Sequence, residues 1–185
     1  MTRFVLLIAV LFSSAQCKTR IGEEIPQIVL DAILNTECLR VNGMLEANFI
    51  RISLKKDVET AKKNGIPVKR HIVKCNNPSK CSEYTNKLLG LNIKNFDLGP
   101  YQINYLYHGY RWKDNGNFQD FFKYDTAEQR TREILGELIL KYGYSWRTIG
   151  RYNHFDASNK WRNINYYSKI YKYIYGEKPK LFSKK

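Results

Sequence analysis

The segment IPQIVLDAILNTECL, residues 25–39, limits the possible folds of this chain more than any other stretch. Its apolar residues recur at the spacing of an α-helix, and Pro26 stands near the start, where proline is favoured. Apolar residues cover one face of this helix and spread beside it: Ile28, Val29, Ala32 and Ile33, flanked by Leu30 and Leu34. A helix that is apolar on so many sides is a buried helix. We therefore expect a compact domain packed around residues 25–39.

The same segment carries a carboxylate, Glu37, one helical turn beyond Ile33 and on the same side. Burial of a carboxylate is costly unless the group is paired or protonated, and burial raises its pKa. Glu37 is therefore a candidate general acid that stays protonated near neutral pH. From the residues alone, an ordinary helix-end glutamate with a salt-bridge partner is the other interpretation.

The residues that follow this helix show few patterns of regular secondary structure. Residues 39–90 read as mostly irregular, with short strands in ANFIRISL and HIVKC and a short helix in DVETAKKNG. With the helices expected later in the chain, this pattern predicts a mainly α fold (α+β) with a few short strands. A chain of 185 residues is long enough for one domain with a real core.

The second half predicts three helices. The first is expected to begin near Thr126, where TAEQ matches a capping box, and to end at Gly143. Ser145 is expected to cap the next helix, WRTIGRYN. The last helix is expected near residues 164–175, with a stripe of Tyr and Ile.

Residues 1–15 have the pattern of a secretory signal. A short positive start precedes the apolar run FVLLIAVLF and the small residues SSA, and the run is too short to span a bilayer. We expect cleavage after Ala15, a folded domain over 16–178 and a loose basic tail over 179–185. A lipoprotein signal with Cys17 as the acylated residue is the alternative, which Gln16 fits poorly. No later segment is apolar enough to cross a membrane.

The cysteines are expected to form disulfides. An even number of cysteines in an exported protein predicts disulfides, and the four are Cys17, Cys38, Cys75 and Cys81. Cys75 and Cys81 flank a turn-rich loop, NNPSK, and are the natural pair, which leaves Cys17 with Cys38. Their spacing and the three scattered histidines do not favour a zinc site. We expect no metal and no cofactor.

Charge and aromatic content narrow the class of partner. Lys and Arg number 31 against 17 Asp and Glu, a formal charge of +14, which attracts polyanions such as cell-wall polymers and membrane surfaces. The 14 Tyr, 9 Phe and 3 Trp suit either stacking on sugars or binding of single-stranded nucleic acid. A secreted nucleic-acid binder is one alternative, but no nucleic-acid motif appears, so we expect no nucleic-acid partner.

Neutral amides interrupt an apolar stretch at FDLGPYQIN. Gln102 and Asn104 stand there among apolar residues, together with Asp97. Neutral hydrogen-bonding groups in an apolar cleft suit a neutral, polyhydroxylated ligand such as a sugar. Alternatively, the amides satisfy backbone groups in a turn. Asp97 is expected to be a structural hydrogen-bonding residue rather than a catalyst.

Three pieces of sequence then stand in order. A helix ends in Glu37, the segment DLGPYQIN follows, and YSWRTIGRYN ends with Tyr152 and Asn153. In this order they resemble the lytic transglycosylases of the goose-type lysozyme superfamily, especially the small secreted members that accompany conjugation, type IV and type III secretion machines. That family has Glu-Ser at a helix end, then Gly-Leu-Met-Gln-Ile-Asn, then Trp ahead of Ala-Tyr-Asn. The likeness covers roughly residues 21–173.

The resemblance implies a lysozyme-like fold and a set of site residues. Glu37 matches the family's single catalytic acid. Gly99 supports the turn, and Gln102 and Asn104 would hold the acetamido and hydroxyl groups of the sugar. Three departures stand out: Cys38 replaces the supporting Ser, Pro100-Tyr101 replaces Leu-Met, and Arg151 replaces the Ala before Tyr-Asn.

The late helix completes the implied site. Asn153 would join the amides that hold the sugar, and Tyr152 would orient Glu37 or the substrate N-acetyl group. Tyr101 is expected to line the substrate pocket. Trp146 matches the family's Trp and is expected to be mainly a core residue. Core packing is the other interpretation of Tyr152.

The family's reaction cleaves the β-1,4 bond between N-acetylmuramic acid and N-acetylglucosamine and leaves a 1,6-anhydromuramyl end. The resemblance therefore implies an enzyme of the periplasm whose partner is the peptidoglycan glycan strand. An envelope-spanning secretion or conjugation machine is a further implied partner. A hydrolytic muramidase and a non-catalytic peptidoglycan-binding adaptor of the same fold are the alternatives.

Overall fold

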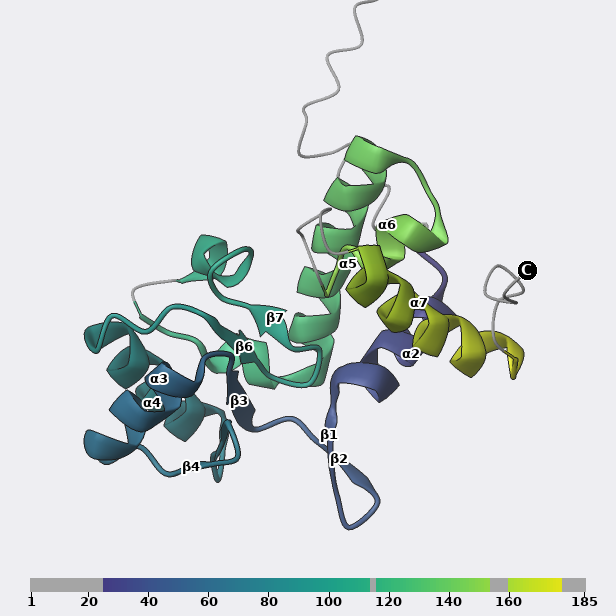
Figure 1. The fold of residues 1–185 in the computed structure, drawn as a ribbon. Helices are drawn as coiled ribbons and strands as arrows, with labels where there is room; N and C mark the ends of the chain where they lie inside the picture. Colours follow the sequence, from purple (N-terminus) through teal and green to yellow (C-terminus); the bar gives the residue numbers. More distant parts are fainter. Residues whose placement is uncertain (1–24, 114–115, 154–159, 178–185) are drawn as a thin grey trace, which may run out of the picture.

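The computed structural model describes residues 25–113, 116–153 and 160–177, with the side chains of the last range from residue 164 onward. The expected signal, the boundaries of the expected domain at 16 and 178, the tail over 179–185 and Cys17 lie outside the described residues. A small sheet with its own helices lies beside a group of four other helices (Figure 1). The predicted fold class, mainly α with a few short strands, is confirmed.

Four helices form the helical part, and α2 lies between α7 and α5. They are α2 (Gln27–Glu37), α5 (Tyr124–Tyr142), α6 (Trp146–Gly150) and α7 (Lys160–Tyr175). The predicted burial of α2 is confirmed, since Leu30, Ala32 and Ile33 are fully enclosed. The exception is Ile28, which was expected on the buried face but is 48% exposed. None of the helices in the described ranges is long and apolar enough to cross a bilayer.

The ends of α5 and α6 differ in part from the expectation. α5 begins at Tyr124, and its N-cap is Lys123 without a side-chain cap, so the capping box expected at Thr126 does not form. The predicted end of α5 is confirmed by Gly143, with φ +74°, at the C-cap, and so is the predicted Ser145 cap, which accepts from the Thr148 amide. α6 is shorter than expected, because residues 151–153 form a turn.

The second part contains two sheets. A hairpin pairs two strands, and a five-stranded antiparallel sheet has the order β4-β5-β3-β6-β7. The strands are β1 (Leu39–Val41), β2 (Met44–Glu46), β3 (Phe49–Ile52), β4 (Val68–Lys69), β5 (Ile72–Lys74), β6 (Phe96–Leu98) and β7 (Ile103–Asn104). The helical elements here are α3 (Lys55–Lys63), α4 (Pro78–Gly90), η1 (Gly109–Trp112) and η2 (Gln119–Phe122).

This part is more regular than expected. The predicted strands in ANFIRISL and HIVKC and the helix in DVETAKKNG are confirmed as β3, β5 and α3. The expectation of mostly irregular structure over residues 39–90 is wrong, because α4 alone has 13 residues. The buried side of α4 consists of Cys81, Ser82, Thr85 and Leu88. Small polar residues on a buried face hide the apolar periodicity that reveals a helix.

The two faces of the five-stranded sheet differ in chemistry because side chains alternate along each strand. One row of directly paired residues is apolar and belongs to the core: Val68, Val73, Ile50, Leu98 and Ile103. The next row, on the opposite face, contains most of the sheet's polar groups: Lys69, Ile72, Arg51, Asp97 and Asn104. We call this second set the polar row. It crosses all five strands.

The predicted disulfide between Cys75 and Cys81 is confirmed. It joins the end of β5 to the first turns of α4. A closed loop this short lowers the conformational entropy of the unfolded chain, which adds about 2 kcal/mol to the free energy of unfolding. We expect the double variant Cys75→Ala/Cys81→Ala to lose about that much free energy of unfolding in a urea titration. Unchanged stability of the variant would contradict a structural role for this bond.

Candidate active site

Glu37 is the last residue of α2, where the helical group meets the sheet. Its side chain is buried, with 6% of its surface exposed. Asn153, in the turn after α6, donates from Nδ2 to Glu37 Oε1 at 2.8 Å. Burial raises the pKa of Glu37 to about 7, against the opposing effect of the Asn153 bond. A carboxyl group with this pKa is able to give and take a proton near neutral pH.

Tyr166, from α7, is a neighbour of Glu37 that the sequence pattern did not predict. Its side chain is 5% exposed, and its hydroxyl faces Glu37 closely enough to lower the carboxyl pKa. The hydroxyl nevertheless forms no hydrogen bond of good geometry with any residue in the described ranges. Its only signal in the sequence was membership of the Tyr and Ile stripe of the last helix, which equally predicts core packing.

A second carboxylate, Asp97, is close enough to Glu37 for its charge to change the Glu37 pKa. Its negative charge raises the pKa of Glu37, while Arg51, its partner in the polar row, lowers it. Burial raises the pKa of Asp97 itself to about 6, against the Asn104 hydrogen bond and Arg51. Asn104 Nδ2 donates to Asp97 Oδ1 at 2.7 Å, in agreement with a structural hydrogen-bonding role. Asp97 thus combines that role with a direct influence on the candidate acid.

Asn104 is engaged within the protein. Besides Asp97, its Nδ2 donates to Asn95 Oδ1 at 3.2 Å, and its Oδ1 accepts from the Tyr107 amide at 3.3 Å. These bonds match the alternative in which the amide of Asn104 supports a turn. A sugar that binds to Asn104 would have to share or replace them.

Gly99 and Gln102 shape the turn between β6 and β7. Gly99 has φ +67°, and an added Cβ there would lie 1.8 Å from the Phe121 carbonyl oxygen. Gln102 is in the left-handed region with φ +50°, and its Nε2 donates to the Gly99 carbonyl at 2.7 Å. Its Oε1 is buried and accepts no hydrogen bond from a described residue. Gln102 therefore holds the turn with one end of its amide and leaves an acceptor at the other.

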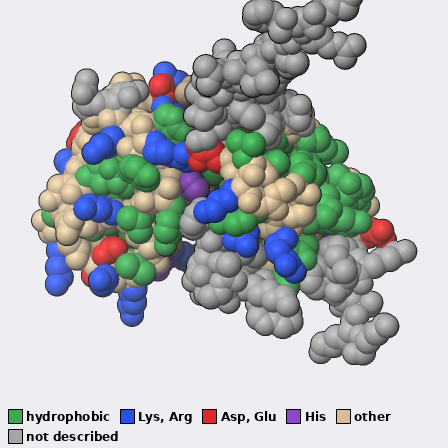
Figure 2. All heavy atoms as spheres, turned by 90° about the horizontal axis from the view of Figure 1, so that it is seen from above, with side chains coloured by type: hydrophobic (Ala, Val, Ile, Leu, Met, Phe, Trp, Pro, Cys, Tyr) green, Lys and Arg blue, Asp and Glu red, His purple; other side chains and the backbone are tan. Residues whose placement is uncertain are grey.

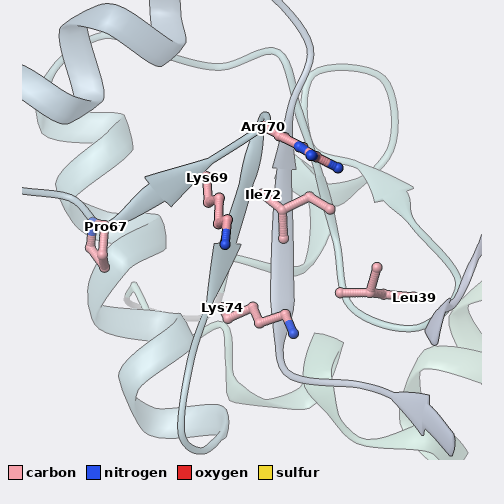
Figure 3. A pocket seen from close by; sticks show the side chains of 6 residues that line it. All are labelled: Leu39, Pro67, Lys69, Arg70, Ile72 and Lys74. Atoms are coloured by element: carbon pink, nitrogen blue, oxygen red, sulfur yellow. The ribbon is translucent and has the colours of Figure 1, made fainter. Parts of the chain in front are cut away.

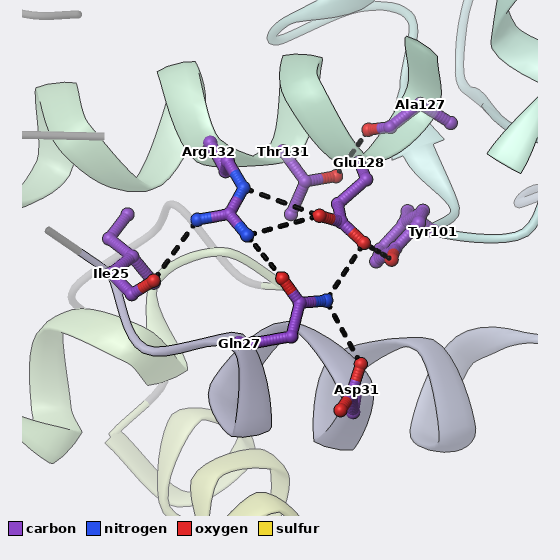
Figure 4. A network of polar contacts seen from close by, with 8 residues as sticks. All are labelled: Ile25, Gln27, Asp31, Tyr101, Ala127, Glu128, Thr131 and Arg132. Atoms are coloured by element: carbon purple, nitrogen blue, oxygen red, sulfur yellow. Dashed lines mark hydrogen bonds and ion pairs between the residues drawn. The ribbon is translucent and has the colours of Figure 1, made fainter. Parts of the chain in front are cut away.

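The two tyrosines of the predicted site, Tyr101 and Tyr152, are part of the hydrophobic core. Tyr101 is 1% exposed, and its hydroxyl donates to Glu128 Oε2 at 3.0 Å, so its side chain does not line a substrate pocket as expected. Figure 4 shows this contact within a network that ties α2 to α5 through Gln27, Glu128 and Arg132. Burial accounts for this position, because a Tyr ring is mostly apolar and needs only one partner for its hydroxyl.

Tyr152 connects the late turn to the DLGPYQIN segment. Its hydroxyl donates to the Tyr101 carbonyl at 2.8 Å and shares a hydrogen bond with Thr131 at 3.2 Å. It therefore does not bond to Glu37, which was one of its expected roles, and the neighbouring Asn153 does. Tyr152 is 7% exposed, in agreement with the core-packing interpretation. By anchoring the turn, Tyr152 positions Asn153 against the candidate acid.

Cys38 lies behind the site rather than in it. Its thiol is 8% exposed and donates to the Glu46 carbonyl at 3.2 Å, so it connects the end of α2 to the β1–β2 hairpin. Burial raises the pKa of this thiol. The expected partner, Cys17, lies outside the described residues. Trp146, expected mainly in the core, is partly buried and packs edge-on against Tyr171 at 5.2 Å.

The structure therefore brings Glu37, Asp97 and Asn153 together, with Tyr166 beside them, and gives Tyr101, Tyr152 and Cys38 supporting positions. No group of three potential metal ligands gathers within the described ranges. No protein-family model, curated protein or solved structure matches this chain. The chemistry of the site is inferred from its own residues.

Two substitutions are expected to move the pKa of Glu37 in opposite directions. Asp97→Asn removes a neighbouring negative charge while it keeps an acceptor for Asn104, so the pKa of Glu37 falls. Asn153→Ala removes a donor that favours the charged carboxylate, so the pKa rises. Titration of the Glu37 carboxyl carbon by 13C NMR measures both. Shifts in the same direction would contradict this arrangement of charges.

Proposed function

We propose that this protein is a peptidoglycan lytic transglycosylase with Glu37 as its acid. One observation carries the proposal: a buried carboxyl group, with a pKa raised to about 7, is held by an amide at the meeting point of the sheet and the helices. A group protonated near neutral pH suits donation of a proton to a glycosidic oxygen. The order of the three sequence pieces supports the same reaction.

In the proposed reaction, protonated Glu37 donates its proton to the oxygen between N-acetylmuramic acid and N-acetylglucosamine. The bond from that oxygen to muramyl C1 breaks, and the carbonyl oxygen of the substrate N-acetyl group stabilises the positive charge at C1. Glu37, now a carboxylate, takes the proton of the muramyl C6 hydroxyl. The C6 oxygen then bonds to C1 and closes the 1,6-anhydro ring, which restores the acid and consumes no water.

The neighbours of Glu37 support these two steps. The Asn153 donor stabilises the carboxylate that exists between the steps, while burial favours the protonated form that begins them. Gln102 Oε1 and the Tyr166 hydroxyl are buried polar atoms without a hydrogen-bond partner in the described ranges, and a sugar would contact them only after the side chains that cover them move. Because the nucleophile belongs to the substrate, a single protein carboxyl is sufficient.

A hydrolytic muramidase is the second candidate, and Asp97 is the observation that favours it. Glycosidases that use water commonly have two carboxyl groups around the scissile bond, and Asp97 is close enough to raise the pKa of Glu37. Against this role, Asp97 Oδ1 accepts a hydrogen bond from Asn104 and the carboxylate interacts with Arg51, so only Oδ2 remains for a water. A water-activating base needs a free carboxylate oxygen directed at the water.

We also propose that the protein acts in the periplasm on glycan strands, where an envelope-spanning machine needs the wall opened locally. The expected signal and the disulfide support export. The basic surface supports attraction to an anionic wall, and Figure 2 shows Lys and Arg side chains spread over one face with few acidic ones.

The first test is release of soluble muropeptides from purified, protein-free sacculi by the chain from Gln16 to Lys185. The proposal predicts release that stops as pH rises past about 7, as Glu37 loses its proton. Binding to sacculi without any release across the pH range would contradict an enzyme and favour the adaptor alternative.

A further inference from the structure

A basic pocket opens on the sheet, outside the site described above. It has a volume of about 580 Å³ and lies along β4 and β5, with one residue from β1. Figure 3 shows Lys69, Arg70 and Lys74 around it. The remaining lining is apolar: Leu39, Pro67 and Ile72. The pocket thus combines three cationic side chains with an apolar surface between them.

The three cations of this pocket are exposed, and no described carboxylate forms an ion pair with any of them. Elsewhere in the described chain, cations such as Lys80, Arg111 and Arg132 do pair with carboxylates. A concave surface lined by charges of one sign concentrates an anionic ligand. The charge of this pocket is available to a partner outside the chain.

The pocket and Asp97 of the candidate active site lie on the same face of the sheet, along the polar row. Lys69 and Ile72, which line the pocket, occupy the β4 and β5 positions of that row. Arg51 is directly paired with Ile72 on the same face and interacts with the charge of Glu37. Adjacent strands are about 4.8 Å apart, so Lys69 lies about 14 Å across the sheet from Asp97. Leu39 is two residues from Glu37 and borders the pocket from the other side.

We propose that this pocket is a subsite for the stem peptide of peptidoglycan, whose carboxylates would meet Lys69, Arg70 and Lys74. The inference rests on the proposed function. A glycan held at Glu37 carries its peptides on the muramyl residues, and these peptides bear several carboxylates and short apolar side chains. The three cations match the carboxylates, and Leu39, Pro67 and Ile72 match the apolar groups. The enzyme would therefore prefer strands that still carry peptides.

The test measures binding separately from cleavage. In a Glu37→Gln background, the triple variant Lys69→Gln/Arg70→Gln/Lys74→Gln is compared with a control of equal charge, Lys55→Gln/Lys56→Gln/Lys63→Gln, in which the changed residues are exposed on α3. The ligands are uncross-linked glycan strands with their stem peptides, and the same strands after amidase has removed the peptides. Circular dichroism confirms that both variants fold.

We expect the pocket variant to bind peptide-bearing strands about tenfold more weakly, while its affinity for stripped strands changes little. The control should lose little affinity for either kind of strand. If the pocket variant and the control lost the same affinity for peptide-bearing strands, the pocket would contribute only general charge attraction, and the proposal would be overturned. Poly(glycerol phosphate) is the third ligand, and a loss of binding confined to it would overturn the proposal and assign the pocket to phosphate polymers. Failure of the native chain to cleave sacculi would overturn the proposed function, whereas peptide-dependent binding would still be measurable.

Discussion

Replacement of Glu37 by glutamine is expected to abolish peptidoglycan cleavage and, at alkaline pH, to stabilise the folded protein. Glutamine keeps the size of the side chain and an acceptor for Asn153, but it has no proton to give. Loss of a general acid costs at least about 10²- to 10⁴-fold in rate, and here the same group acts in both steps. We expect a fall of about 1,000-fold or more.

The stability gain follows from the direction of the pKa shift. Glu37 has a folded pKa of about 7 against 4.5 for an ordinary glutamate, so the folded state holds the proton more tightly than the unfolded state. Its contribution to stability is complete below about pH 4.5 and is lost as pH rises through about 7. A shift of this size corresponds to about 3 kcal/mol, which the uncharged glutamine does not lose.

Urea unfolding of Glu37→Gln and the native chain at pH 5 and pH 8.5 measures this gain. Because part of the contribution is already lost at pH 5, the free energy of unfolding of the variant should rise relative to the native chain by about 2.5 kcal/mol between the two pH values. Glu59→Gln, at an exposed position on α3, serves as the control and should show no such gain. A Glu37→Gln variant that remains active, or that is less stable at pH 8.5, would contradict the role of Glu37 as a buried acid.

The second large effect is expected at Gly99, where alanine should prevent stable folding. Two causes add at this position. The backbone has φ +67°, which disfavours any residue with a Cβ, and the Cβ itself would overlap the Phe121 carbonyl oxygen at 1.8 Å. The oxygen belongs to the backbone of η2, so relief requires η2 and the β6–β7 turn to separate. We expect a loss of about 4 kcal/mol or more.

Gly65 supplies a matched control for this substitution. It has φ +74°, close to that of Gly99, but an added Cβ would meet no atom within 4 Å. Gly65→Ala should therefore cost only the backbone strain, about 1 kcal/mol. The difference between the two variants in urea unfolding isolates the close approach of η2. Equal losses at the two glycines would show that this packing contributes little.

Several parts of this structure could be predicted because a local signal specified them. The apolar periodicity of residues 25–39 predicted the buried helix, and with it the burial of Glu37. The turn-rich loop between Cys75 and Cys81 predicted the disulfide. In each case the evidence lay within a few neighbouring residues, where short-range geometry decides the outcome.

Other parts depended on contacts that no local pattern records. The proximity of Tyr166 and Asp97 to Glu37 arises from α7 and β6, which are distant from α2 in the sequence. Tyr101 was expected in the substrate pocket because of its place in the turn, but its partner Glu128 comes from α5. The polar row likewise depends on the strand order, which no local sequence pattern reveals.

The central claim is that cleavage proceeds without water and depends on Glu37. We would digest purified sacculi in water enriched in oxygen-18 with the native chain and with Glu37→Gln, and analyse the products by mass spectrometry. The proposal predicts 1,6-anhydromuramyl ends without oxygen-18 from the native chain, and no products from the variant. Reducing muramyl ends labelled with oxygen-18 would contradict it and identify a muramidase, with Asp97 as the next residue to replace.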